Sequence, residues 1–248
     1  MNSVQQQSKP LGVGDRVPEV VFRTRTEDDW LDVDSRAVFA GRTVVVFSLP
    51  GAFTPTCSGS QLPGYNRLAG EFRQRGVDEI VCLAVNDAFV MREWGLTQNA
   101  ENVRLIPDGN GEFTRGMGML VDKQALGFGQ RSWRYSMLVR NGVIEQIFPE
   151  PQVPGDPYEV SDPETMLRYL DPDIRMPDDI ALFVRAGCPH CTRAKALLKA
   201  RGIVFDSFKT HSPQALHAVA GATSTPQVFV NGECIGGADE LEAYLTSH

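Results

Sequence analysis

Five cysteines, at positions 57, 82, 188, 191 and 234, are the residues of this 248-residue chain best suited to redox chemistry. A thiol attacks other molecules as its thiolate, and an ordinary free cysteine is mostly protonated at neutral pH. The unpaired amides and the positive dipole end of a helix N-terminus favour the thiolate. We therefore expect chemistry at those cysteines that begin a helix.

The segment around Cys57 predicts such a placement. The apolar run 44–49 is rich in β-branched residues and stops at Pro50-Gly51, which predicts a buried strand followed by a turn. Helical apolar spacing runs from Cys57 to Phe72. Cys57 is thus expected just after a strand, at the start of a helix.

The Cys188-Pro-His-Cys191 segment predicts the same arrangement, since it follows a predicted strand over 180–184 and precedes a helix over 190–200. In this context a Cys-x-x-Cys motif is typical of a redox pair. Zinc is the main alternative, but a structural zinc site needs four ligands and the sequence has no second Cys-x-x-Cys or paired histidine motif. We expect a redox pair and no metal.

The remaining two cysteines, Cys82 and Cys234, fall on predicted strands. A thiol on a strand behaves as a small hydrophobic group. Both are therefore expected to be structural.

A Pro- and Asp-rich segment, 171–179, has the composition of an exposed connector. It predicts domains over 1–170 and 180–248, both α/β, since strands and helices alternate on either side of it. The other predicted elements are strands 80–85, 136–140, 143–148 and 203–208, helices 88–96, 166–170 and 240–245, a capping box at Ser161–Glu164, a helix opened by Ser212-Pro213, and hairpins at Asn141-Gly142 and Asn231-Gly232.

The Pro50-x-x-x-Thr54-x-x-Cys57 motif resembles the signature of the peroxiredoxins, most closely the peroxiredoxin 5-type subfamily. Segments 85–90 and 134–137 support the resemblance, which covers residues 10–170.

The resemblance implies that Cys57 is the peroxidatic cysteine, that Thr54 hydrogen-bonds the peroxide and the thiolate, that Pro50 shields the site and that Arg134 stabilises charge. Arg134 is preferred to Arg131 because it lies just before the Tyr-Ser-Met strand. These residue types suit the reaction, because breaking an O–O bond moves negative charge to the departing oxygen and fixed donors stabilise that charge.

Attack on a peroxide leaves Cys57 as a sulfenic acid, which must meet another thiol before further oxidation. Cys82 is the only other cysteine of the first domain, and it does not match a resolving position of the family. The domain therefore resembles a one-cysteine type that takes its second thiol from elsewhere.

The second half resembles glutaredoxin over residues 178–248, through the Cys-Pro-x-Cys motif and segments 224–228 and 236–239. Together the two resemblances imply two thioredoxin-fold domains. They also imply that Cys188 is the nucleophile and Cys191 the second thiol, while His190 replaces the usual aromatic residue as a solvent-facing spacer. The implied glutathione-binding residues are Arg185, Thr225, a cis Pro226, Gly237, Ala238 and Asp239.

The combination resembles the bacterial hybrid peroxiredoxin-glutaredoxin proteins. It implies an antioxidant peroxidase that reduces hydroperoxides with glutathione as co-substrate, without a bound cofactor, and contributes to cell redox homeostasis. Two alternatives stay open: a thiol-disulfide reductase acting on mixed disulfides, and a peroxide sensor that passes oxidation to a partner protein.

The composition of the chain argues against two classes of partner, nucleic acids and membranes. The net charge is −7 and no basic run is present, which argues against nucleic-acid binding. No apolar run is long enough to span a bilayer, and the polar segment 1–10 lacks the apolar stretch of a signal peptide. We expect a bacterial cytoplasmic enzyme, and the resemblance implies a homo-oligomer, a dimer or a tetramer.

Overall fold

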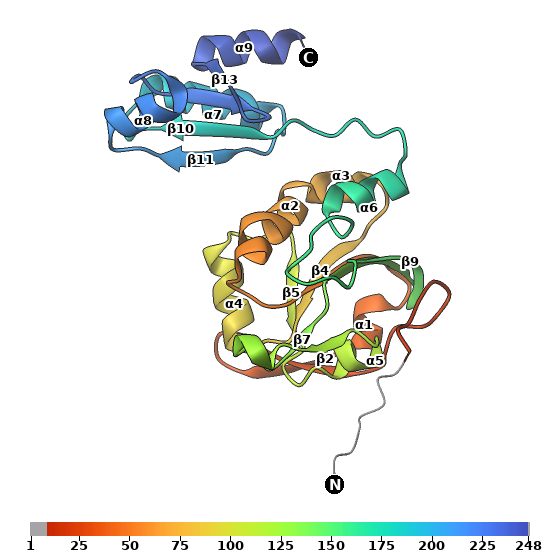
Figure 1. Ribbon diagram of the computed structural model, residues 1–248. Helices are drawn as coiled ribbons and strands as arrows, with labels where there is room; N and C mark the ends of the chain where they lie inside the picture. The colour runs from red at the N-terminus through yellow and green to blue at the C-terminus, as the bar shows by residue number, and fades with distance from the viewer. Residues whose placement is uncertain (1–8, 248) are drawn as a thin grey trace. The chain divides into compact units, whose positions relative to one another are not determined.

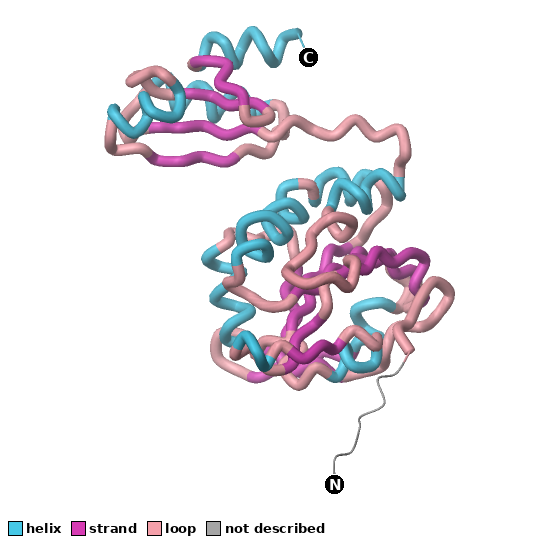
Figure 2. Tube along the Cα trace, viewed as in Figure 1, coloured by secondary structure: helices cyan, strands magenta, loops and turns pink. Residues whose placement is uncertain are grey.

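A computed structural model describes residues 9–247, so the segment 1–8 and His248 of the sequence lie outside the described residues. The chain forms two compact units, residues 1–174 and 175–248. Each unit combines strands with helices, which confirms the α/β class (Figure 2). The division between the units falls inside the segment 171–179.

The first unit is built on a five-stranded sheet of order β5-β4-β3-β8-β9 (Figure 1). Strands β3, β4 and β5 run parallel, whereas β8 pairs antiparallel with both β3 and β9. Apart from its first residue, β3 is buried throughout, as expected of a central strand covered on both faces. The strands are β3 (Thr43–Leu49), β4 (Glu79–Ala84), β5 (Arg104–Pro107), β8 (Tyr135–Arg140) and β9 (Val143–Pro149).

Two small antiparallel pairs and several helices complete this unit (Figure 1). The pairs are β1 (Val21–Arg25) with β2 (Trp30–Asp34) and β6 (Leu120–Asp122) with β7 (Gln130–Ser132). The helices are α1 (Ser35–Phe39), the π-helix η1 (Cys57–Gln61), α2 (Leu62–Arg67), α3 (Ala69–Gln74), α4 (Ala88–Thr97), α5 (Glu112–Gly116), the 3-10 helix η2 (Gln124–Leu126) and α6 (Pro163–Leu170).

The helix predicted from Cys57 to Phe72 is in fact three segments, η1, α2 and α3. The π-helix begins at Cys57, and the amide of Leu62 donates to the Cys57 carbonyl, five residues back. Pro63 then lies in the first turn of α2, and Leu68 leaves helical geometry (φ −88°, ψ 6°) before α3 begins. The apolar spacing predicts the helical character of this stretch but not the changes in winding within it.

The capping box predicted at Ser161–Glu164 is wrong in detail. Asp162 is the N-cap of α6 and accepts from the amide of Thr165 at 2.8 Å, while Glu164 pairs with Arg67. Pro163 explains the shift, because proline suits the first helical position directly after an N-cap.

The second unit has a four-stranded sheet of order β11-β10-β12-β13, in which only β10 and β11 run parallel. Ser212 caps α8 and β12–β13 form the hairpin at Asn231-Gly232, as predicted, whereas the strand predicted over 203–208 is shorter and later. The elements are β10 (Ile180–Val184), α7 (Pro189–Ala200), β11 (Asp206–Lys209), α8 (Pro213–Ala220), β12 (Gln227–Val230), β13 (Glu233–Gly236) and α9 (Ala238–Ser247).

Both ends of segment 171–179 are bound to the unit they adjoin. The Arg75 guanidinium donates to the Asp171 carboxylate at 2.9 and 3.1 Å. The Asn231 side chain donates to Asp178 at 2.8 Å and accepts from the amide of Asp179 at 2.9 Å. The part of the connector between these two sets of bonds is therefore shorter than the predicted connector, residues 171–179.

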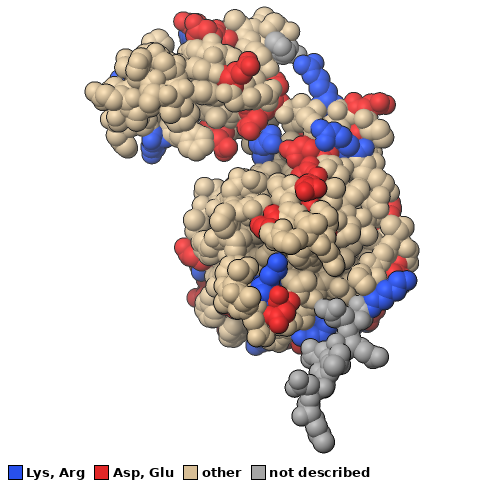
Figure 3. Space-filling view, in the orientation of Figure 1, with Lys and Arg blue, Asp and Glu red and all other residues tan. Residues whose placement is uncertain are grey.

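Charged side chains of both signs are interspersed over the face shown in Figure 3, without a broad basic patch among the described residues in view. A helix long and apolar enough to cross a membrane does not occur within residues 9–247.

Candidate active sites

The turn between β3 and η1 places Cys57. Pro50 is half-buried directly after β3, and a short helical turn begins at Pro55, so Cys57 lies in its first turn rather than capping it. Phe53 has φ +62°, a left-handed conformation that costs a non-glycine residue about 1–2 kcal/mol. Strain of this kind gathers at functional sites, as do π-helical turns such as η1.

Arg134 meets Cys57 inside the domain. Its side chain comes from the junction of β7 and β8 and is 1% exposed, and Cys57 is fully buried. Nη1 of Arg134 donates to Sγ of Cys57 at 3.5 Å and also to the Gln61 side chain. Nη2 donates to both carboxylate oxygens of Asp156, at 2.5 and 2.6 Å. The guanidinium thus connects the sulfur with an amide and a carboxylate.

The charge of Arg134 is secured by this arrangement. Burial by itself lowers the pKa of Arg134, but the Cys57 sulfur and the Asp156 carboxylate outweigh burial and raise that pKa above its usual range. The guanidinium also lies over the ring of Tyr158, 5.6 Å from its centroid. A fixed positive charge therefore faces the sulfur.

Thr54, the threonine of the Pro50-x-x-x-Thr54-x-x-Cys57 motif, lies in the same turn, three residues before Cys57. Its hydroxyl donates to the carbonyl of Gly51 at 2.9 Å, and its carbonyl accepts from the amide of Ser58 at 3.0 Å. The hydroxyl has one proton, so its donor capacity is directed to Gly51 in this state. Its lone pairs still allow it to accept a hydrogen bond.

Cys82 is fully buried on β4, where it pairs with Phe47 of β3. Burial raises the pKa of the Cys82 thiol well above its ordinary value, and the neighbouring Cys57 sulfur raises it further. The thiol therefore stays protonated, as expected of a structural cysteine.

In the second unit, Cys188 is the N-cap of α7. Its sulfur accepts from the amide of Cys191 at 3.2 Å and from the hydroxyl of Thr225 at 3.5 Å, and the thiol donates to the Thr225 carbonyl at 3.3 Å. The peptide bond from Thr225 to Pro226 is cis, as the resemblance to glutaredoxin implied. The structure thus places four residues predicted for this site next to one another: Cys188, Cys191, Thr225 and Pro226.

The two thiols of the pair differ in acidity. Desolvation raises the pKa of Cys188, but the hydrogen bonds from Cys191 and Thr225 outweigh it, and the net pKa lies below the ordinary value. For Cys191, burial and the neighbouring Cys188 raise the pKa. Cys188 is therefore the better nucleophile at neutral pH.

Of the other residues predicted to bind glutathione, Gly237 lies close to Pro226. A side chain at Gly237 would lie 3.7 Å from the carbonyl oxygen of Pro226, so the start of α9 lies against the cis-proline edge. The Gly237 amide donates to Glu240 at 2.7 Å. Ala238 is buried, whereas Arg185 and Asp239 are exposed.

The exposed carboxylate of Asp239 is already paired. Its partner is Arg193 of α7, and this bond lowers the pKa of Asp239, with a smaller contribution from His190. His190 is exposed, as expected of a spacer. Asp239 is thereby tied to the helix that begins with the Cys188 pair.

Cys234 is exposed, so it does not pack as the small hydrophobic group expected of a cysteine on a strand. It lies on β13, at the edge of the sheet, and its thiol donates to the Gln227 side chain at 3.5 Å. An edge strand has one open side, so strand assignment did not imply burial.

Sequence reasoning missed the partners of the predicted residues, namely Gln61, Asp156, Arg193 and Glu240. Gln61 lies one helical turn after Cys57, a spacing that would have placed the two side chains on one face. Asp156 lies in a Pro- and Gly-rich loop without periodicity, and no sequence signal marks it.

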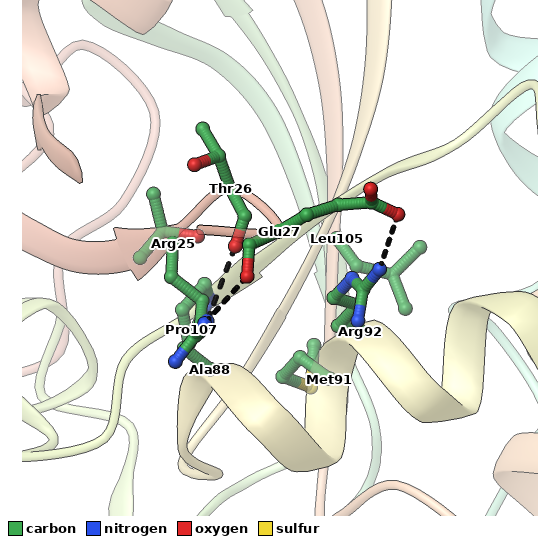
Figure 4. A pocket seen from close by; sticks show the side chains of 9 residues that line it. Arg25, Thr26, Glu27, Ala88, Met91, Arg92, Leu105 and Pro107 are labelled. Carbon is green, nitrogen blue, oxygen red and sulfur yellow. Dashed lines mark hydrogen bonds and ion pairs between the residues drawn. The ribbon is translucent and has the colours of Figure 1, made fainter. Parts of the chain in front are cut away.

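A separate pocket of about 440 Å³ lies between the β1–β2 hairpin and α4 (Figure 4). Arg92 pairs with Glu27 at its rim, and Arg25 donates to the carbonyls of Thr26 and Glu27. None of its lining residues belongs to the predicted sites. Among residues 9–247, no cluster of His, Cys, Asp and Glu is arranged to hold a metal ion.

Comparisons with known proteins agree with the two-site architecture. The Redoxin family matches residues 12–167 and the Glutaredoxin family matches residues 180–235. The chain is 54% identical over 235 residues to hybrid peroxiredoxin hyPrx5 of Haemophilus influenzae, covering 94% of this chain and 98% of that protein. It is 56% identical over 169 residues to peroxiredoxin sll1621 of Synechocystis, covering 63% of this chain and 89% of that protein.

A solved structure supports the fold of the first unit. It is that of reduced Prx3 in complex with H2O2 from Vibrio vulnificus, with a TM-score of 0.61 and 40% identity, covering 65% of this chain and 99% of that one. The chain therefore belongs to the hybrid peroxiredoxin-glutaredoxin family and is a peroxidase made of two thioredoxin-fold domains.

Proposed function

We propose that the enzyme is a glutathione-dependent peroxidase, with the overall reaction ROOH + 2 GSH → ROH + H2O + GSSG. One observation carries the proposal. The only cysteine that accompanies Cys57 in the first domain is Cys82, which is buried and held protonated. The second thiol must come from elsewhere, and the same chain carries a glutaredoxin domain with an acidified Cys188.

The first step is the attack of the Cys57 thiolate on one peroxide oxygen. A sulfur–oxygen bond forms, the O–O bond breaks, and the departing oxygen takes the electron pair and a proton as water or alcohol. Arg134 is the charged donor beside the sulfur, and such a donor stabilises charge that develops in the transition state. Thr54 serves as the second donor once its hydroxyl turns from Gly51, and Pro50 shields the sulfur.

Glutathione then condenses with the sulfenic acid of Cys57 and releases water. The thiolate of Cys188 attacks the glutathione sulfur of this mixed disulfide, which frees Cys57 and leaves Cys188 glutathionylated. A further glutathione attacks that mixed disulfide, releases oxidised glutathione and restores Cys188. The lowered pKa of Cys188 supports its role as the attacking sulfur.

The glutathione tripeptide has an α-amino group and two carboxylates, so it needs donors and acceptors at both ends. Arg185 offers a fork of donors for the glycine carboxylate. The main chain of Thr225-Pro226 binds the peptide backbone. Gly237, Ala238 and Asp239 receive the γ-glutamyl end at the start of α9, where helix amides favour a carboxylate. Asp239 would leave Arg193 to bind the amino group.

Tethering raises the effective concentration of one domain near the other, to about the millimolar range when the linker lets the sites meet. In a homo-oligomer, a dimer or a tetramer, the glutaredoxin domain of one subunit would also be able to meet the peroxiredoxin domain of another. A bacterial cytoplasm suits the enzyme, because it keeps such thiols reduced.

A coupled assay with hydrogen peroxide, glutathione, glutathione reductase and NADPH tests the proposal. We expect NADPH consumption that requires all components and continues over many turnovers. Consumption that stops after one equivalent of peroxide would contradict glutathione dependence and favour a peroxide sensor. Reduction of a small mixed disulfide without any peroxide turnover would favour a thiol-disulfide reductase.

A further inference from the structure

Glu150 is a buried carboxylate that the proposed reaction does not use. It directly follows β9 and is 2% exposed. It accepts hydrogen bonds from three successive main-chain amides: Glu159 at 2.9 and 3.0 Å, Val160 at 3.0 Å and Ser161 at 2.8 Å. A buried carboxylate is costly unless it is bonded in this way, so Glu150 and segment 159–161 hold each other in place.

The main chain of Glu150 is bonded to the short segment between β7 and β8 that carries Arg134. Its amide donates to the Arg134 carbonyl at 3.0 Å, and its carbonyl accepts from the indole of Trp133 at 2.8 Å. Glu150 therefore connects the backbone of Arg134 to segment 159–161.

The loop before that segment contacts the Arg134 guanidinium directly, and the segment itself is connected to the guanidinium through Gln61. On one side, Asp156 binds Nη2 and Tyr158 underlies the guanidinium. On the other side, Ser161 accepts from the Gln61 amide at 3.4 and 3.5 Å, and the Gln61 oxygen accepts from Nη1. The charged partner Asp156 and the amide partner Gln61 are thus each linked to segment 159–161, Asp156 through the loop that precedes it and Gln61 through Ser161.

We propose that Glu150 is a positioning residue for peroxide reduction, which acts by holding the Arg134 guanidinium against the Cys57 sulfur. This inference rests on the roles proposed above for Cys57 and Arg134. Glu150 does not touch the peroxide. Its effect on rate comes from geometry, because misplacing a catalytic group by about 1 Å can cost about 100-fold.

The test measures oxidation of Cys57 by hydrogen peroxide in a single turnover, on the full chain and without glutathione. Glu150→Gln puts an amide donor among three amide donors, so segment 159–161 loses part of its anchor. We expect the second-order rate constant to fall about 10- to 100-fold. Glu150→Asp keeps the carboxylate and should react faster than Glu150→Gln.

Asp108 provides a matched control. It is also a buried carboxylate that accepts main-chain amides, from Phe113 at 3.2 Å and Thr114 at 2.8 Å, but these bonds hold the start of α5. Asp108→Asn should lower the thermal stability and leave the peroxide rate per folded molecule unchanged. If this variant slowed the reaction as much as Glu150→Gln does, the effect would be general destabilisation and the inference would be wrong.

A double-mutant cycle with Arg134→Lys separates positioning from independent effects. If Glu150 acts through Arg134, adding Glu150→Gln to Arg134→Lys should change the rate by no more than about twofold. If the rate constant of the double variant fell by the product of the two single-variant losses, the inference would be overturned. If Glu150→Gln does not fold, Glu150→Asp carries the same cycle. Full reactivity of Arg134→Lys alone would instead refute the proposed role of Arg134.

Discussion

The amide of Cys191 donates to the sulfur of Cys188 at 3.2 Å, across the first turn of α7. This contact stabilises a thiolate at Cys188, while burial and, to a smaller extent, the neighbouring Cys188 sulfur disfavour a thiolate at Cys191. The pKa of Cys188 is lowered and the pKa of Cys191 is raised. The pair is thus divided into one thiol that ionises more readily and one that holds its proton more strongly.

This division predicts selective alkylation. Because a lowered pKa moves thiolate formation to lower pH, iodoacetamide should modify Cys188 with a midpoint below the ordinary value of about 8.5. Peptide mass spectrometry across a pH series would identify the modified site and its midpoint. Preferential modification of Cys191 at neutral pH would contradict the assignment.

Cys57→Ser should abolish peroxide reduction and leave the reduction of a small glutathione mixed disulfide largely intact. The two nucleophiles belong to separate units, so the reduction of a small mixed disulfide by Cys188 does not need the Cys57 sulfur. Both activities are measured on the same preparation, with circular dichroism to establish folding. Comparable loss of both activities in a folded protein would refute the two-site scheme.

Arg134→Lys should slow the oxidation of Cys57 by about 100- to 1,000-fold, the usual cost of removing one transition-state donor. Lysine keeps a positive charge but lacks the planar fork that contacts Cys57, Gln61 and Asp156 together. Stopped-flow fluorescence or competition for peroxide measures the rate constant. An Arg131→Lys variant is the matched control, and a larger loss there would show that the wrong arginine was assigned.

Cys82→Ser should retain most of the turnover, because a buried thiol with a strongly raised pKa does not act as a resolving nucleophile. Cys234→Ser should also retain turnover. The coupled assay and a thermal unfolding curve are recorded for both variants. Loss of peroxidase activity in folded Cys82→Ser would identify it as a resolving cysteine.

The sequence predicted the central strands, the hairpin around Asn141-Gly142 and the placement of Cys188 because each depends on local pattern and turn chemistry. It also indicated that Arg134 and Cys57 meet, but only through the family resemblance. The contact joins residues 77 positions apart, and no periodicity reports such a distance.

Residues whose role depends on tertiary contacts were not predictable. Asp156 lies in the loop after β9, and Glu150 lies at the start of that loop. The sequence of the loop is typical of an ordinary turn, and only the folded chain places the two residues around Arg134. The exposure of Cys234 follows from the edge position of β13, which requires knowledge of strand order.

The most direct test of the account is the fate of Cys57 in the Cys188→Ser variant. We expect one equivalent of peroxide to oxidise Cys57, glutathione to add to it, and the cycle to stop there, so that intact-protein mass spectrometry shows glutathione accumulating on Cys57. Cys191→Ser should turn over more readily, because the monothiol route needs only the attacking sulfur. Added glutaredoxin should restore part of the Cys188→Ser rate. Full glutathione-driven turnover by Cys188→Ser alone, with Cys57 unmodified, would show that the fused domain is not the reductant.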